Sequence, residues 1–447
     1  MQTPIYDFVQ NYINSGMTRF HMPGHKGKSF LGIEPLDITE IKGADELYSP
    51  SGIIAESEEN ATKLFGTAHT YYSTEGSTLA IKAMLAIAMK SAPSKKNATV
   101  LAARNAHKAF LYSAALLDFD IEWLYPEESS HLCKCEISPA ALEASLEKMI
   151  EKPFAVYLTS PDYLGNIADI KGLSKICDKY GIPLLVDNAH GAYLAFLEPS
   201  LHPIALGASM CADSAHKTLP VLTGGAYLHI AKKAEHLTKY ARSSLSLFAS
   251  TSPSYLILQS LDLANAYIAD GYAEKLHRTR RGVASAKGTI QGTGFAPEKT
   301  EPLKIVIHAS KYGYTGDELA EHLRENGIEC EFSDRDYLVL MATPENDEDE
   351  LKDYEKLYLA FMLLSPKPEI SEARVSVQKA PMKMSVREAI FSQSERVATR
   401  DALGRILASP TVSCPPAVPI AISGEEITES VVKALLSYGI NELEVVK

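Results

Sequence analysis

The chain has few cysteines, and they form no recognisable framework. Its 447 residues include six cysteines, of which Cys133 and Cys135 form the only close pair. No second pair completes a zinc motif, and six cysteines are too few to staple a chain of this length. His21 and His25 are separated by Pro23-Gly24, which keeps the two imidazoles off one helical face. We therefore predict a reduced protein with no metal site.

Long apolar runs and an excess of positive charge are also missing. The longest apolar helix-like run, residues 79–89, contains Lys82 and is too short to span a bilayer. The first residues, MQTPIYDF, lack the basic and apolar regions of a secretory signal. The formal net charge of −12 argues against nucleic acid or an anionic membrane as the main partner. These absences predict a cytoplasmic protein with neither kind of partner.

What the sequence does contain is the pattern of an α/β protein. Between residues 60 and 295, short apolar runs alternate with helical patterns, which predicts a large, mostly parallel sheet wound by helices. A stretch near residues 288–298 that contains Gly, Thr and Pro precedes a smaller α/β pattern. We predict an N-terminal arm at residues 1–45, a large domain at 46–295, a small α/β domain at 296–371 and a C-terminal domain at 372–447.

Individual elements follow from the spacing of apolar residues. The strands expected in the large sheet are residues 99–103, 155–159, 184–187, 209–213 and 225–230. The clearest helices between them are residues 77–90, 170–180 and 254–268. In the C-terminal part we expect strands at 303–308, 329–332 and 337–341, helices at 316–326 and 386–407, and a final helix and strand.

Two charged residues thirty positions apart carry the first chemical signal. Asp187 ends the apolar run 182–186, which is typical of a strand buried on both faces, and ligands bind at the carboxyl ends of such strands. Lys217 lies on the connection between two further apolar runs. An amine that can form a Schiff base and a carboxylate that keeps a pyridine nitrogen protonated are the pair that pyridoxal phosphate (PLP) requires. Asp187 could instead cap a helix, but residues 188–191 are a poor helix start.

Two further segments fit a cofactor site less specifically. Gly76, Ser77 and Thr78 open the helix at residues 77–90, and a helix N-terminus with two hydroxyl groups can seat a phosphate. Ordinary helix capping explains the same residues about as well. His107 follows the strand at 99–103, where an imidazole could stack on a cofactor ring or simply be a satisfied loop histidine.

Taken together, the motifs resemble the Orn/Lys/Arg decarboxylases, PLP enzymes with the aspartate-aminotransferase fold (fold type I). The chain is similar to their compact branch, which lacks an N-terminal receiver-like domain. The matching segments follow the family's order along nearly the whole chain: residues 19–27, 65–66, 76–78, 104–108, 161–165, 187–192, 214–217 and 251–255.

The resemblance implies roles for individual residues. Lys217 would be the Schiff-base lysine, Asp187 the partner of the pyridine nitrogen, and His107 the residue stacked on the ring, with His216 beside Lys217 in the catalytic set. The residues expected to bind PLP are Gly76, Ser77, Thr78, His107, Asp187, Ala189, His190, Ser214, His216, Lys217, Thr251 and Ser252. The resemblance also implies a homodimer in which the arm around residues 21–26 completes the partner's active site.

The expected activity is decarboxylation of arginine, lysine or ornithine to an amine and CO2. Three positions depart from the family's pattern: Asn188, Glu75 and residues 414–419. None touches the core PLP chemistry, but residues 414–419 lie in the domain that the resemblance implies for binding the substrate's distal end, which leaves the substrate open. For the substrate's distal cation we expect Glu425 or Glu426, although a glutamate at a helix N-terminus would explain them equally well.

Two other functions remain open from the sequence. One is an aminotransferase or another PLP lyase on the same fold. An aminotransferase would need an arginine for the substrate α-carboxylate, for which Arg374 is the candidate. A protein that binds PLP without catalysis and acts in regulation is the other alternative.

Overall fold

The computed structural model describes the chain from Met1 to Lys447 except residues 93–97, 127–130, 348–351, 371–378 and 411–417. Two compact units interleave along the sequence. The first contains Met1–Leu101, Pro139–Leu158 and Asp169–Ala273, and the second contains Ala102–Ser138, Thr159–Ala168 and Glu274–Lys447. These units do not test the four-part division predicted from the sequence, which stays a prediction.

The first unit holds the N-terminal helix and most of the large sheet. Its helices are α1 (Pro4–Asn14), α2 (Ile53–Phe65), α3 (Gly76–Ser91), α5 (Pro139–Lys148), α6 (Ile170–Tyr180), α7 (Ala215–Thr218), α8 (Ala241–Phe248) and α9 (Tyr255–Ala269). Its strands are β1 (His69–Ser73), β5 (Leu184–Asp187), β6 (Met210–Asp213) and β7 (Ala226–Ile230). Strands β2 (Thr99–Ala103) and β4 (Ala155–Thr159) begin in this unit.

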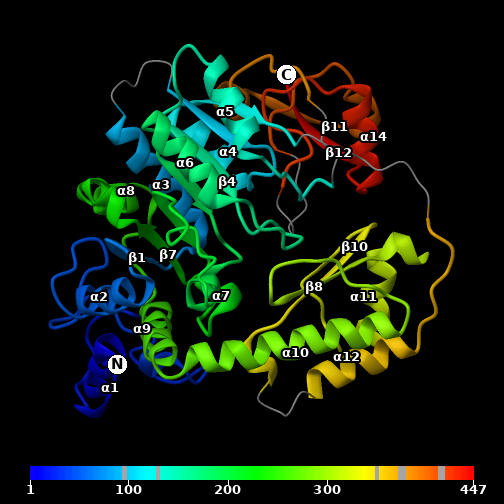
Figure 1. Ribbon diagram of the computed structural model, residues 1–447. Coiled ribbons are helices and arrows are strands. Elements are labelled where there is room, and N and C mark those ends of the chain that lie inside the picture. Colours follow the sequence, from blue (N-terminus) through cyan, green and yellow to red (C-terminus); the bar gives the residue numbers. More distant parts are fainter. Residues whose placement is uncertain (93–97, 127–130, 348–351, 371–378, 411–417) are drawn as a thin grey trace. The chain divides into compact units, whose positions relative to one another are not determined.

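The large sheet has seven strands in the order β1-β7-β6-β5-β4-β2-β3, where β3 is Asp120–Leu124. Figure 1 labels β1, β7 and β4 of this sheet. Strands β5 and β6 run parallel, whereas β7 is antiparallel to both β6 and β1. The five strands predicted for this sheet are confirmed to within one residue at each end. Strands β1 and β3 were not predicted. The reversed direction of β7 makes the pairings at the β1 end of the sheet antiparallel. The expected α/β class with a mostly parallel sheet is confirmed.

Burial explains why these segments form the centre of the unit. Every residue of β5, β6 and β7 is buried, which matches their nearly continuous apolar sequences. Helix α3 is apolar and buried from Leu79 to Ala88 apart from Lys82, and it packs against β6, β7 and α8. Its N-terminus is therefore fixed relative to the ends of β6 and β7.

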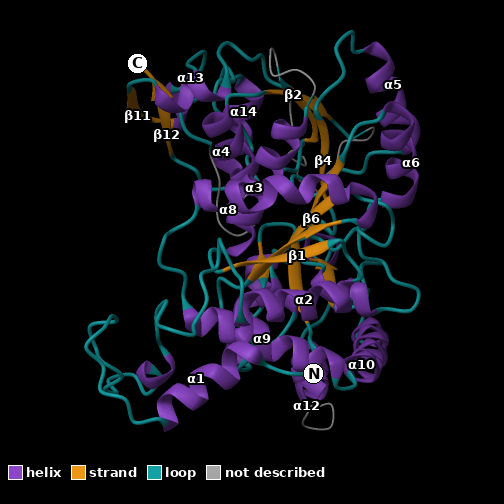
Figure 2. Cartoon of the chain, turned by 90° about the vertical axis from the view of Figure 1, so that its left-hand side faces the viewer, coloured by secondary structure: helices purple, strands orange, loops and turns teal. Residues whose placement is uncertain are grey.

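Helix α1 is attached to the same unit through a buried carboxylate. Asp262 of α9 accepts hydrogen bonds from the backbone N–H groups of Ile5 and Tyr6, at 2.9 and 3.0 Å. These are N–H groups of the first turn of α1, which have no partner within the helix. Figure 2 shows loops beside α1 that extend away from the sheet.

The second unit contains the remaining elements. Its helices are α4 (Lys108–Leu117), most of α10 (Tyr272–Gly292), α11 (Gly316–Glu325), α12 (Lys352–Met362), α13 (Val386–Phe391) and α14 (Glu429–Ser437). Strands β8 (Lys304–His308), β9 (Phe332–Ser333) and β10 (Tyr337–Met341) form one sheet in the order β8-β10-β9. Strands β11 (Ser394–Ala398) and β12 (Glu442–Val446) form an antiparallel pair.

Two predicted elements of this unit are wrong. The helix predicted at residues 386–407 ends at Phe391, because β11 follows and pairs with β12, with Val397 opposite the buried Leu443. Pairing with a segment far along the chain overrides the local helical preference there. The strand predicted at 329–332 is the two-residue β9, displaced toward its C-terminal end. The helix predicted at 316–326 and the strands predicted at 303–308 and 337–341 are confirmed to within one residue at each end. The final helix and strand, predicted without bounds, are α14 and β12.

A buried charge connects distant segments of the second unit. Arg104, 1% exposed, donates to the backbone oxygens of Pro419 and Ile420 at 2.9 and 3.1 Å, and lies 3.8 Å from Glu425 Oε2. Glu425 Oε2 also accepts the backbone N–H of Ile422 at 2.8 Å, and burial raises the pKa of Glu425. Removing one member of such a group leaves the other charge buried without its partner.

We expect Arg104→Leu to lower the free energy of unfolding by about 3–5 kcal/mol, because it leaves the buried Glu425 carboxylate and two carbonyl groups without their partner. Urea unfolding followed by circular dichroism measures this. The matched control is Arg324→Leu, which breaks exposed ion pairs with Glu321 and Glu329 and should cost about 0–1 kcal/mol. Equal losses in both variants would contradict a special role for the buried charge.

Candidate active site

The carboxyl ends of β5 and β6 bring the two predicted reactive groups to one edge of the sheet. In the parallel register of these strands Asp187 lies beside Ala212, so Asp187 ends β5 where β6 also ends. The chain leaves β6 through Ser214 into the short helix α7, which carries Lys217. This is the edge at which parallel α/β sheets bind their ligands.

Asp187 is a buried carboxylate that accepts few hydrogen bonds. Its Oδ2 accepts the hydroxyl of Tyr157 at 3.2 Å and its Oδ1 accepts the backbone N–H of Ala189 at 3.2 Å. Burial raises its pKa to about 6, against which the positive charge of Lys217 acts. A buried carboxylate of this kind favours a cationic ligand group, such as a protonated pyridine nitrogen.

Lys217 is half-buried, and its Nζ lies 3.1 Å from Nε2 of His190. His190 comes from the segment that follows β5, so the contact joins the two strand ends. The predicted residues Asp187, Ala189, His190 and Lys217 are thus brought together.

The N-terminus of α3 provides room for an anion. Gly76 has a φ of +68°, and a side chain built on it would meet no other atom within 4 Å. Ser77 Oγ accepts the Ser214 hydroxyl at 2.8 Å, which ties this helix end to the segment before Lys217. The side chain of Glu75 does not cap the helix, since its Oε1 accepts the backbone N–H of Ser250 at 2.7 Å. Backbone N–H groups at such an end suit phosphate.

The other predicted residues of the first unit surround this helix end. Nδ1 of His216 lies 3.0 Å from the backbone oxygen of Gly225, next to Gly224, whose oxygen accepts the N–H of Gly76. Thr251 and Ser252 are exposed and directly follow Ser250, the partner of Glu75. Thr78 is half-buried in the first turn of α3.

His107 belongs to the second unit, and its predicted place on the cofactor ring stays a prediction. It caps the N-terminus of α4, where its Nδ1 accepts the backbone N–H of Ala109 at 3.1 Å. Arg374, the candidate carboxylate ligand of an aminotransferase, lies outside the described residues.

Sequence reasoning missed two tyrosines. Tyr157 hydrogen-bonds Asp187, and its place in the middle of an apolar strand gave no sign of that. The buried hydroxyl of Tyr48 has no hydrogen-bond partner among the described residues, and burial together with the charge of Glu75 raises its pKa. An unused donor close to Glu75 fits an anion bound at the N-terminus of α3.

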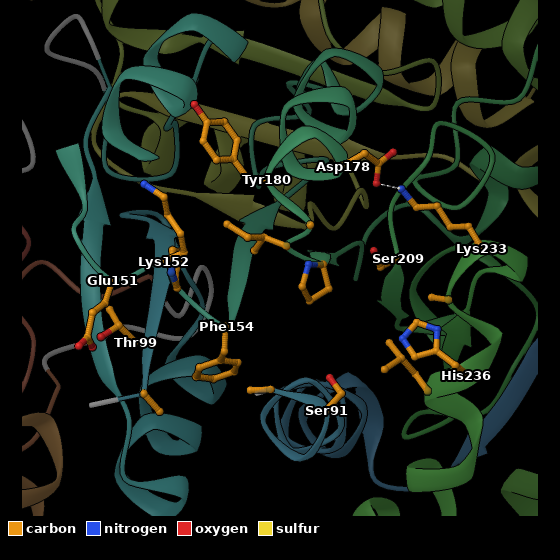
Figure 3. A pocket seen from close by; sticks show the side chains of 18 residues that line it. Ser91, Thr99, Glu151, Lys152, Phe154, Asp178, Tyr180, Ser209, Lys233 and His236 are labelled. Atoms are coloured by element: carbon orange, nitrogen blue, oxygen red, sulfur yellow. Dashed lines mark hydrogen bonds and ion pairs between the residues drawn. The ribbon is translucent and has the colours of Figure 1, made fainter. Parts of the chain in front are cut away.

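A cavity of about 750 Å³ lies at the opposite edge of the sheet (Figure 3). Residues that precede or begin the strands line it, among them Thr99, Phe154, Pro183 and Ser209. Lys233 pairs there with Asp178 at 2.6 Å. Because this edge holds the amino ends of the strands, the cavity is separate from the group around Asp187 and Lys217.

Among the described residues, no helix combines the length and apolar character needed to cross a membrane.

Comparison with known proteins supports one family. The family model described as "Orn/Lys/Arg decarboxylase, major domain" matches residues 3–291. An arginine decarboxylase of Halalkalibacterium halodurans is 31% identical over 96% of this chain and 92% of its own length. An arginine decarboxylase of Bacillus subtilis is 29% identical over 96% of this chain and 92% of its own.

Solved structures agree on the fold. The constitutive lysine decarboxylase of E. coli aligns with a TM-score of 0.76 at 19% identity, covering 100% of this chain and 82% of that one. The lysine decarboxylase of Francisella novicida aligns with a TM-score of 0.79 at 17% identity, covering 100% and 81%. With the fold type I architecture and the matched family model in place, this chain belongs to the Orn/Lys/Arg decarboxylase family.

Proposed function

We propose that this chain is a PLP-dependent decarboxylase that converts a basic amino acid to an amine and CO2. The observation that carries the proposal is the meeting of buried Asp187 and half-buried Lys217 at the carboxyl edge of β5 and β6. The named arginine and lysine decarboxylases among its relatives support a basic substrate. The family assignment favours decarboxylation over transamination or a purely regulatory role.

The described residues fit PLP as the cofactor. Lys217 would hold it through its amine, and Asp187 would face its ring nitrogen. Gly76, Ser77, Thr78, Ser214 and His216 would bind the phosphate at the N-terminus of α3. Ala189 and His190 would lie against the ring, with His107, Thr251 and Ser252 completing the site as the family resemblance implies. When bound, PLP acts as an electron sink for the bond that breaks at the substrate Cα.

The chain's own groups would set the conditions for this chemistry. Tyr157 and the N–H of Ala189 orient the Asp187 carboxylate, and its burial keeps water from competing for the ring nitrogen. Lys217 Nζ, 3.1 Å from His190 Nε2, is an amine that can hold a proton and exchange it with the imidazole.

The two glutamates expected at the substrate's distal cation have cationic partners of their own. Glu425 is 1% exposed and pairs with Arg104, and Glu426 pairs with Lys383 at 3.0 Å. Neither begins a helix, since α14 starts at Glu429 after its N-cap Thr428, so the helix-dipole explanation is wrong. We therefore leave both glutamates out of the proposed substrate site.

We also propose that the active protein is a homodimer whose arms complete the partner's sites. The arm exposes large apolar side chains that water does not favour: Phe20 is 94% exposed, Leu31 84% and Phe30 79%. A group of exposed apolar residues is typical of an interaction surface. His21 hydrogen-bonds Tyr12 of α1 at 2.6 Å, so the segment is held in place rather than loose.

The reaction is tested directly on PLP-loaded protein. Incubation with each of the twenty amino acids and with ornithine should release CO2 and an amine from arginine, lysine or ornithine. Lys217→Ala should abolish release, and borohydride should attach PLP covalently to Lys217 of the unchanged chain. Accumulation of a keto acid, or CO2 from none of the amino acids, would overturn the proposed function.

Asp187→Asn should bind PLP but lower turnover by at least roughly a hundredfold, because one preorganised charge is lost. Without PLP the same variant should be more stable than the unchanged chain at a pH well above 6. The reason is that the pKa of Asp187 is about 6 in the folded chain and 3.8 ordinarily. The folded state therefore favours the protonated carboxyl, and this contribution to stability is lost as the pH rises through 6 and the buried group becomes charged. The asparagine of the variant does not become charged.

Thermal unfolding of both PLP-free proteins measures this gain, which amounts to at most about 3 kcal/mol. The gap should close below the ordinary pKa of 3.8. Asp162 and Asp262 also have pKa values raised to about 6, but they are common to both proteins and cancel in the difference. A variant that is less stable at high pH would show that Asp187 is satisfied without the cofactor.

If two subunits share each active site, two inactive variants should restore activity when they are combined in one dimer. A Lys217→Ala chain and a chain lacking residues 1–27 carry different tags and are purified as the mixed dimer. One of its two sites then has both the lysine and an arm, so the mixed dimer should regain up to about half the native activity. Each homodimer is the control. An arm that serves only its own chain's site would give no recovery.

A further inference from the structure

A second group of reactive side chains, on β6, β7 and the connection before β6, takes no part in the proposed active site. His202, Cys211, Asp213 and His229 are all buried in the first unit. Each offers one potential metal-ligating atom, and these atoms lie within 4.8 Å of one another. No cysteine-pair motif in the sequence announces this group, because its members come from three segments.

Strand geometry explains how the group assembles. Cys211 and Asp213 are two residues apart on β6, so both side chains lie on one face of the sheet. Cys211 is directly opposite His229 in the antiparallel pair of β6 and β7. His202, from the connection before β6, places its Nε2 over the same face, 3.0 Å from Asp213 Oδ2 and 3.8 Å from Cys211 Sγ.

We propose that this group binds a structural zinc ion. Two imidazoles, a thiolate and a carboxylate are zinc's usual ligands, and around a tetrahedral zinc such atoms are about 3.3–3.8 Å apart. The separations run from just below that range to its upper end: His202 Nε2 and His229 Nε2 lie 3.0 and 3.1 Å from Asp213 Oδ2, and Cys211 Sγ lies 3.8 Å from His202 Nε2. The charges of the thiolate and carboxylate would neutralise the ion, so the buried group would carry no net charge.

The surroundings are those of a supported and dry metal site. Nδ1 of His229 lies 2.9 Å from the hydroxyl of Thr70, and Asn188 donates to Asp213 Oδ1 at 2.7 Å. Zinc ligands characteristically have such second hydrogen-bond partners. The ring of Phe65 covers the histidines, with its centroid 4.5 Å from that of His229 and 5.8 Å from that of His202.

The same contacts can also form a hydrogen-bond network without metal. The two arrangements differ in which imidazole nitrogens carry protons. In the network both imidazole Nε2–H groups donate to one oxygen of Asp213, while the Cys211 thiol has only long contacts. Zinc binding places the ring proton of His202 on Nδ1 and gives up the 3.4 Å contact from the N–H of Ile204. That contact is at the long limit for a hydrogen bond, so little is lost.

The ion would join β6, β7 and the connection before β6 just ahead of Ser214 and Lys217. Its role is to hold this strand end, since all four ligands are protein side chains and no position remains for a substrate. The zinc site is distinct from the proposed decarboxylation site and does not depend on that activity.

Metal analysis of the PLP-loaded full chain tests the proposal. The protein is produced in zinc-supplemented medium with a tag that binds no metal and is analysed by mass spectrometry of its metals. We expect about one zinc per chain, lost in Cys211→Ser. The matched control is Cys177→Ser, which alters another fully buried free cysteine outside the group and should keep its zinc.

A measurement on the unchanged chain covers the case in which Cys211→Ser does not fold. X-ray absorption at the zinc edge should show one sulfur neighbour, with nitrogen or oxygen in the other positions. Cobalt in place of zinc should give absorption bands in the red, where PLP does not absorb. A folded chain without metal, or bound metal without a sulfur neighbour, would overturn the proposal and leave the hydrogen-bond network.

Discussion

The parallel pairing of β5 with β6 is the constraint on which the candidate site depends. It sets Asp187 beside Ala212, so that the residues after both strands emerge at the same edge. Lys217 then lies beside His190, although 27 positions separate them in the sequence. Helix α3 adds its N-terminus to this edge because its apolar side chains pack on β6 and β7. A shift of one residue in the register of β5 would turn Asp187 to the other face of the sheet.

The buried carboxylate of Asp187 shows how stability is given up for function. Its pKa of about 6 means that the folded chain without a cofactor holds an unfavourable charge at neutral pH. Tyr157 and the N–H of Ala189 offset only part of the desolvation. A ligand that brings a positive charge to this position relieves the cost, so binding energy and folding energy are coupled at one residue.

Much of the fold could be predicted because the central strands of the large sheet are short, apolar and buried. Lys217 and Asp187 stood out for the same reason, as charged residues at the ends of such strands. Strand β3 lacks this burial, since most of its residues are at least partly exposed, and it was missed. Strand β1 and the Arg104–Glu425 pair escaped notice because they depend on partners far along the chain. The helix predicted at 386–407 failed at β11, whose residues have no strong strand pattern and pair only because β12 is present. The group of Cys211 and His229 was invisible because cross-strand register, not sequence spacing, creates it.

The place of Arg104 also bears on how the chain is made on the ribosome. Its carbonyl partners in Pro419 and Ile420 lie more than three hundred residues downstream. At the usual rate of translation, they emerge on the order of tens of seconds after Arg104 does. During that interval the second unit lacks most of its chain, and its first segment, Ala102–Ser138, must wait without its final neighbours. A hydrated guanidinium in that segment is the kind of charge that limits premature association of an apolar strand beside it. We therefore expect this side chain to limit aggregation of the nascent chain before it takes up its buried contacts in the finished one.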